Sequence, residues 1–250
     1  MKAILSKLLM PFLLGLAMLL SGLYIASVSA APVKTPAVLE LFTSQGCSSC
    51  PPADKLLGEL DKRSDVIALS YSVDYWDYLG WKDTLGSPAN SERQRRYAQA
   101  RGDGRVYTPQ IVVDGVAHAV GSNPQAVTEA IAAAQSELAD RKVPIMLSRD
   151  GDALVASIGS GGDGRSATLW AGMAKTAQPV KIARGENRGR TVTYRNNVRQ
   201  LVPVGTWSGE ATRVTIPLSK LKGGGGDRVF VLLQRGAGGP ILGAAELSKL

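Results

Sequence analysis

The stretch that decides the fold runs from residue 37 to residue 52 and reads AVLELFTSQGCSSCPP. Its first part, Ala37–Phe42, is a short apolar run typical of a buried strand, and residues 43–46 then read as a loop. Pro51 and Pro52 suit the first turn of a helix, because that turn needs no backbone donors. The stretch therefore predicts a strand, a loop with two cysteines, and a helix that begins after Cys50.

Further strands and helices alternate along the chain up to residue 142. Apolar runs of four to eight residues indicate the strands, and the Asp114-Gly115 turn separates two runs that can pair antiparallel. We expect strands over Val66–Val73, Gln110–Val113 and Val116–Val120, an aromatic loop over residues 74–81, a basic, exposed helix over Asn90–Arg101 and a helix that opens at Pro124.

The sequence pattern changes at Pro144. Short alternating runs follow, separated by glycine-rich turns such as residues 161–164 and residues 223–226, with no convincing helix between them. We expect a smaller all-β, sandwich-like domain here. The expected organisation is a signal peptide over residues 1–30, a first domain over residues 31–143 and an all-β domain over residues 144–250.

The order of elements between residues 36 and 142 resembles the thioredoxin-like superfamily. Cys47, Cys50 and Thr108-Pro109 carry this resemblance, since a CxxC motif opens a helix and a Thr-Pro pair precedes a strand-turn-strand unit. It implies an α/β thioredoxin-like domain, with a central mixed sheet flanked by helices. It also implies that Pro109 is cis and lies beside the disulfide, where the backbone of Thr108 can pair with an extended substrate chain.

Three longer strings resemble an uncharacterised family of secreted bacterial proteins, which has a thioredoxin-like domain and no assigned function. These strings are residues 40–54 with the CSSC motif, residues 73–77 and residues 184–190. Gly46 and Ser48-Ser49 depart from the residues that well-studied thioredoxins have at these places. The resemblance therefore supports the architecture more than the activity.

The first 30 residues have the pattern of an export signal. Lys2 and Lys7 precede an apolar run over residues 8–26, and Val28-Ser29-Ala30 supplies the small residues of a signal-peptidase site. We expect cleavage before Ala31 and a periplasmic or secreted protein; the alternative is an uncleaved segment that anchors the protein in the inner membrane. Cleavage removes two lysines and lowers the formal charge from +8 to +6, so the protein stays basic.

The two cysteines predict thiol-disulfide exchange with partner proteins. A helix N-terminus stabilises a thiolate, so we expect Cys47 to be the nucleophile and Cys50 to resolve the mixed disulfide. The alternative is a non-catalytic binding module with a structural disulfide, since such bridges are common in oxidising compartments. A bridge across four residues constrains the unfolded chain little, which favours exchange chemistry.

Glu40 is a candidate proton acceptor for the second cysteine. It lies in the strand that leads to the motif, near the place where thioredoxins keep a buried carboxylate. Its offset differs by one residue, which turns a strand side chain to the other face. The alternative is a structurally paired or exposed acid, and a buried, unpaired Glu40 would favour the catalytic role.

No cofactor or metal is predicted for this chain. Two thiolates suit Cu(I), but zinc prefers four ligands, and the sequence has one cysteine pair and one histidine, His118, which suits a structural role better.

Two surface features indicate partner contacts. The aromatic residues Trp76, Tyr78 and Trp81 either roof the site or pack as a surface loop. A group of arginines suits an acidic partner or an anionic envelope surface, or is simply solvated. Nucleic acid is not an expected partner, because export removes the protein from the compartment that contains nucleic acid. The arginines are Arg184, Arg188, Arg190, Arg195 and Arg199.

Overall fold

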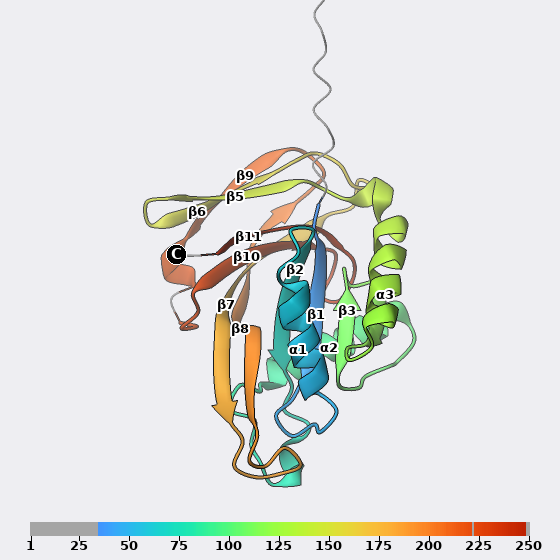
Figure 1. Ribbon diagram of the computed structural model, residues 1–250. Helices are drawn as coiled ribbons and strands as arrows, with labels where there is room; N and C mark the ends of the chain where they lie inside the picture. Colours follow the sequence, from blue (N-terminus) through green and yellow to red (C-terminus); the bar gives the residue numbers. More distant parts are fainter. Residues whose placement is uncertain (1–34, 222, 249–250) are drawn as a thin grey trace, which may run out of the picture. The chain divides into compact units, whose positions relative to one another are not determined.

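The computed structural model describes residues 35–221 and 223–248 and contains two β-sheets. The larger sheet has eight strands in the order β11-β10-β7-β8-β2-β1-β3-β4, and the smaller has three in the order β5-β6-β9 (Figure 1). The strands are β1 (Ala37–Thr43), β2 (Val66–Ser72), β3 (Gln110–Val113), β4 (Ala117–Val120), β5 (Ile145–Asp150), β6 (Ala153–Ile158), β7 (Ala167–Lys181), β8 (Thr191–Trp207), β9 (Thr212–Pro217), β10 (Arg228–Gln234) and β11 (Ile241–Ser248).

Three α-helices lie among the described residues: α1 (Pro51–Leu60), α2 (Pro88–Arg101) and α3 (Pro124–Glu137). Each begins with proline in its first turn, and the side chains of Ser87 and Asn123 cap α2 and α3 by accepting backbone N–H donors. Short 3-10 turns occur at Asp77–Leu79, Ala139–Arg141 and Leu218–Lys220. The sequence pattern therefore predicted the helix starts correctly for α1 and α3 and within two residues for α2.

The central strand β1 is buried on both faces. It runs parallel to β2 and antiparallel to β3, and β3 turns back into β4. Leu39 and Leu41 pack against α1 and α3, whereas Val38 and Phe42 pack against the side that carries α2. Alternate residues of a strand point to opposite faces, so this one run of sequence supplies two separate cores.

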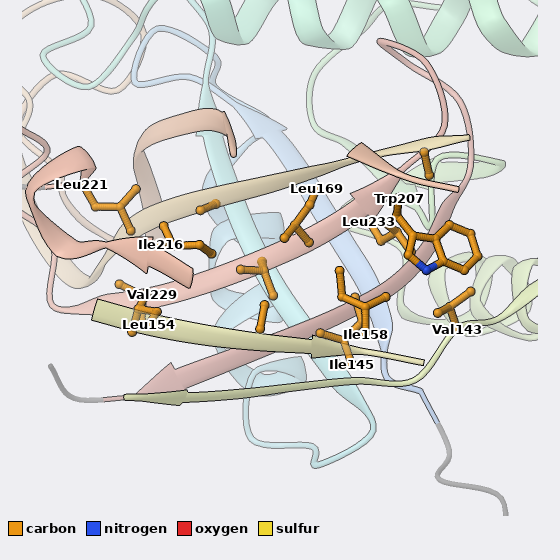
Figure 2. Packing of buried hydrophobic residues seen from close by; sticks show 14 of the residues in the cluster. Val143, Ile145, Leu154, Ile158, Leu169, Trp207, Ile216, Leu221, Val229 and Leu233 are labelled. Atoms are coloured by element: carbon orange, nitrogen blue, oxygen red, sulfur yellow. The ribbon is translucent and has the colours of Figure 1, made fainter. Parts of the chain in front are cut away.

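The smaller sheet packs on the second half of the larger one. Leu154 and Ile158 of β6 and Ile216 of β9 meet side chains of β7 and β10, such as Leu169 and Val229 (Figure 2). These residues alternate with others along their strands, as a sheet with one covered face requires.

The predicted fold class, an α/β thioredoxin-like domain followed by a separate all-β sandwich, is wrong. Strands β7, β8, β10 and β11 continue the sheet that β1–β4 begin. The helices α1 and α3 pack on the N-terminal strands, and α2 packs on these strands and, through Tyr97, on β10. Contacts do not divide the described residues near the expected boundary at residue 143. The result is a mostly β protein built on one long mixed sheet.

The lengths of β7 and β8 explain why the sequence pattern misled. These strands span 15 and 17 residues, whereas short alternating runs were expected, and they continue through Gly172, Pro179 and Pro203. Register shifts near Leu169 and Met173 let the paired strands continue past such residues. A Cβ at Gly172 would collide with the ring of Phe230 from β10, so this glycine allows close packing rather than a turn.

The predicted export signal falls on residues 1–30, which lie outside the described residues. None of the described helices has both the length and the apolar character that crossing a membrane requires.

The shared core predicts that residues 31–143 do not fold alone. Tyr71 and Tyr97 pack in one cluster with Phe230, Leu232 and Ile241, which the fragment would lack. We expect the full chain to unfold in a single cooperative thermal transition followed by near-UV circular dichroism, and the fragment to show none. A cooperative transition in the fragment would contradict the shared core.

Candidate functional site

The two cysteines form a disulfide at the start of α1. Cys50 is the N-cap residue and Cys47 lies one turn before it, with 5.4 Å between their Cα atoms. Both cysteines are buried, at 2% and 0% exposure, whereas Ser48 and Ser49 between them are exposed. The motif thus has the predicted place in the fold, and its surface is formed by the two serines.

Thr108-Pro109 forms the one cis peptide bond of the described residues, as the resemblance implied. Pro109 is buried and directly precedes β3, which pairs with β1. The Thr108 hydroxyl accepts a hydrogen bond from Trp76 Nε1 at 2.7 Å. Trp76 also stacks on the exposed Tyr78, so the predicted aromatic loop is fixed to the segment before Pro109.

The loop before the cysteines is held by the same aromatic segment. The backbone N–H of Gln45 donates to Asp83 at 2.8 Å, and Trp81 Nε1 donates to the Gln45 side-chain oxygen at 2.8 Å. A Cβ at Gly46 would lie 2.9 Å from the Trp76 Cβ. The close approach of Trp76 therefore leaves room only for glycine before Cys47.

The turn between β7 and β8, residues 182–190, covers this loop and is called the hairpin tip below. The buried Asn187 donates from Nδ2 to the carbonyl oxygens of Gln45 and Cys47, at 3.0 and 2.8 Å. Glu186 accepts the N–H of Ser48 at 3.3 Å. Sequence reasoning assigned no role to these two residues, since nothing in the sequence shows that a segment 140 positions away returns to the cysteines.

Glu40 does not have the surroundings expected of a proton acceptor for Cys50. It is fully buried, and its carboxylate forms a two-pronged ion pair with Arg93 at 2.8 and 3.1 Å and a hydrogen bond with Tyr97. Both partners come from α2, on the face of β1 opposite α1. The one-residue offset thus turned Glu40 away from the cysteines, and the structurally paired alternative is favoured.

The helix α2 is consequently not the exposed helix that its charge suggested. Five of its residues are buried, and two of these, Arg93 and Tyr97, engage Glu40. Burial and the nearby charge of Glu40 raise the pKa of Tyr97 well above its usual value, so the hydroxyl keeps its proton. A buried ion pair of this kind fixes the position of α2 on the sheet.

Asp54 is the buried acid that lies near the cysteines. It is 3% exposed, sits one helical turn after Cys50, and has an Oδ2 atom with no hydrogen-bond partner among the described residues. Burial raises its pKa to about 8, opposed by the Thr43 hydroxyl and aided by the charge of Asp83. The spacing of four residues from Cys50 was a signal in the sequence, since such residues share a helix face.

The remaining candidates do not form one cluster. On the hairpin tip, three arginines are exposed: Arg184, Arg188 and Arg190. Arg195 lies beside α1, and the half-buried Arg199 donates to the side chain of Gln178 in β7. His118 contacts Tyr107 and Asp103, and burial lowers its pKa. No group of three potential metal ligands occurs within residues 35–221 and 223–248.

The fold and site together define a class: a mostly β protein with a long mixed sheet and a CxxC disulfide at a helix start. The chain belongs to the family DUF1223, described as proteins of unknown function, whose pattern matches residues 38–234. This match covers the CxxC loop and reaches every described strand except β11.

Solved structures that resemble this chain include the following two. An X-ray crystal structure of a protein from Agrobacterium tumefaciens is 35% identical, with a TM-score of 0.76, and covers 87% of this chain and 96% of its own. HBP35 of Porphyromonas gingivalis is 13% identical, with a TM-score of 0.58, over 86% of this chain and 76% of its own, and shows a likeness of fold alone. A search of curated proteins gives no match.

The raised pKa of Asp54 predicts a specific pH dependence of stability. The Asp54 carboxyl ionises near pH 4 in the unfolded chain, whereas its pKa in the folded protein is about 8. The contribution of Asp54 to the free energy of unfolding is therefore fully present below pH 4 and is lost as the pH rises to 8. Relative to wild type, Asp54→Asn should gain up to about 5 kcal/mol in unfolding free energy between pH 4 and pH 8, since each pKa unit corresponds to about 1.4 kcal/mol.

Chemical denaturation at a series of pH values measures this difference, with the disulfide kept oxidised. Asp140→Asn, which changes an exposed carboxyl, is the matched control and should differ from wild type by a constant amount. An Asp54→Asn curve parallel to that of the wild type would contradict the raised pKa.

Proposed function

We propose that this protein is a thiol-disulfide oxidoreductase that exchanges disulfides with partner proteins through Cys47 and Cys50. The observation that supports it most is the position of the disulfide, at the start of α1 and followed one turn later by the buried, partly unpartnered Asp54. A buried acid with a strongly raised pKa beside a disulfide adds nothing to stability at neutral pH, which favours a role in proton transfer.

The reaction begins with Cys47 in the reduced protein. Its thiolate attacks one sulfur of a partner disulfide, a new sulfur–sulfur bond forms, and the partner's other sulfur leaves as a thiolate. The positive end of the α1 dipole and the Ser49 hydroxyl, which lies 3.4 Å from the Cys47 sulfur, stabilise the Cys47 thiolate.

Cys50 completes the exchange. Because the pKa of Asp54 is about 8, a minor fraction of this group is ionised at neutral pH, and in that form its carboxylate accepts the proton of the Cys50 thiol. The Cys50 thiolate then attacks Cys47, so the mixed disulfide breaks and the partner leaves with its second sulfur reduced. Two electrons pass from the cysteine pair to the partner, and the reverse sequence oxidises a dithiol. Cys50 and Asp54 are four residues apart, which places their Cβ atoms about 5–6 Å apart on one face of the helix. The Cys50 thiol can therefore transfer its proton to Asp54 directly or through one water.

Burial of Cys47 supports a second candidate, a non-catalytic binding module with a structural disulfide. Only 2% of the residue is exposed, and Asn187 on the hairpin tip holds its carbonyl. Exchange therefore requires a small displacement of the hairpin tip or of Ser48 and Ser49, which form the exposed surface. The structural alternative predicts that this displacement does not occur in the folded protein.

The proposal extends to the setting of the protein. The leader pattern supports export to the periplasm or beyond, where disulfide exchange has substrates; an uncleaved leader would instead keep the protein at the inner membrane. A distant relationship to the thioredoxin-like superfamily is supported by the local order of β1, the CxxC loop, α1 and cis Pro109, although the fold as a whole differs.

Single-cysteine variants test the proposed chemistry. Cys50→Ser should form a mixed disulfide with glutathione disulfide at Cys47 in the native state, at least ~10-fold faster than Cys47→Ser does at Cys50, because Cys47 is the activated thiol. Mass spectrometry of samples quenched with acid follows the adduct. If both variants react only after denaturation, the structural disulfide is the correct reading.

A further inference from the structure

A groove follows directly from the CxxC motif along α1. It has a volume of about 590 Å³ and lies between α1 and the first part of β8. Pro51, which follows Cys50, lines one end, and Lys62 beyond the last turn of α1 also lines it. A partner chain held at Cys47 therefore has a surface beside it on which to lie.

The groove carries an excess of positive charge. Lys55, Lys62 and Arg195 line it, against the exposed Glu59. The other two acids of the lining are neutralised in different ways. Burial keeps Asp54 largely protonated below pH 8, and Asp61 is bound by Arg228 at 2.7 Å and by Asn196 at 2.6 Å. The net charge thus favours an acidic occupant.

The wall formed by β8 offers free backbone groups. In the described residues, β8 pairs with β7 along the hairpin, but its ladder with β2 is limited to Ser70 and Asn197. Residues 191–195 therefore have an unpaired edge on the side of α1, where Thr191 and Thr193 line the groove. An exposed edge of this kind can add an extended peptide by main-chain hydrogen bonds.

Gly58 shows that the groove is shaped by the packing of α1 on β8. A Cβ at this position would lie 3.1 Å from the Arg195 Cγ. The stem of Arg195 thus lies across α1, with its guanidinium in the lining of the groove. This arrangement holds the exposed Arg195 at the edge of the groove, beside α1.

We propose that the groove between α1 and β8 binds an extended acidic segment of the substrate protein next to its reacting cysteine. This inference rests on the proposed function and names its substrate class. The acidic side chains contact Lys55, Lys62 and Arg195, and the peptide backbone pairs with the free edge of β8.

Two cysteine-containing peptides test the substrate class with the purified full chain. They are identical except that aspartates or lysines follow the cysteine, and each is supplied as a mixed disulfide. The reduced wild type should react with the acidic peptide roughly 10-fold faster than with the basic one, as expected for three partly exposed charges at low salt. This preference should fall to about 2-fold in the double variant Lys62→Gln, Arg195→Gln.

The matched control is Arg149→Gln, Arg213→Gln, which removes two exposed charges from the smaller sheet. It should keep the wild-type preference. Reaction of every variant with hydroxyethyl disulfide, a neutral small molecule, should be unchanged. Failure of all of these reactions would overturn the proposed function, whereas normal reaction with the small disulfide and no acidic preference would overturn the groove alone.

Binding without chemistry gives an independent readout. A fluorescent acidic peptide without cysteine should bind the oxidised full chain, and methylation of alternate backbone nitrogens should weaken binding several-fold, because it removes donors to the β8 edge. Equal binding of the methylated peptide would contradict the edge pairing. An acidic preference that persists in the Lys62→Gln, Arg195→Gln variant would place recognition elsewhere, for example at the hairpin tip.

Discussion

The arrangement of the site depends on where β8 leaves the sheet. The strand meets β2 at Ser70 and Asn197, where the Asn197 amide also donates to the Ser72 hydroxyl at 3.3 Å. The part of β8 before Asn197, residues 191–195, lies beside α1 instead of β2. The hairpin tip, which precedes this part, therefore reaches the CxxC loop. One strand thereby follows the hairpin tip that contacts Cys47, lines the groove and joins the two halves of the sheet (Figure 1).

The two faces of β1 carry buried acids with different roles, a structural one on one face and a proposed catalytic one on the other. On one face Glu40 has its hydrogen-bonding capacity met by Arg93 and Tyr97, which suits a structural role. On the other face Asp54 is also buried, and no cation among the described residues forms an ion pair with it, so burial raises its pKa to about 8. Proteins retain such an unfavourable group where it has a function, and here it lies one turn from Cys50.

Local pattern allowed much of the N-terminal half to be predicted. The apolar run of β1, the prolines that open α1 and α3, and the Asp114-Gly115 turn are short-range signals, and each element was found. The sheet junction was not predictable, because it depends on contacts between residues more than 100 positions apart, such as Asn196 with Ala68. For Glu40 the sequence left two roles open, and its one-residue offset in the strand was the signal for the structurally paired one.

The reduction potential of the Cys47–Cys50 pair in the full chain tests the central claim most directly. Equilibration with glutathione buffers, followed by trapping and mass spectrometry, gives the value. The account predicts a reversible couple above about −270 mV in the native protein. A pair that stays oxidised to well below about −300 mV would contradict it and show a structural disulfide.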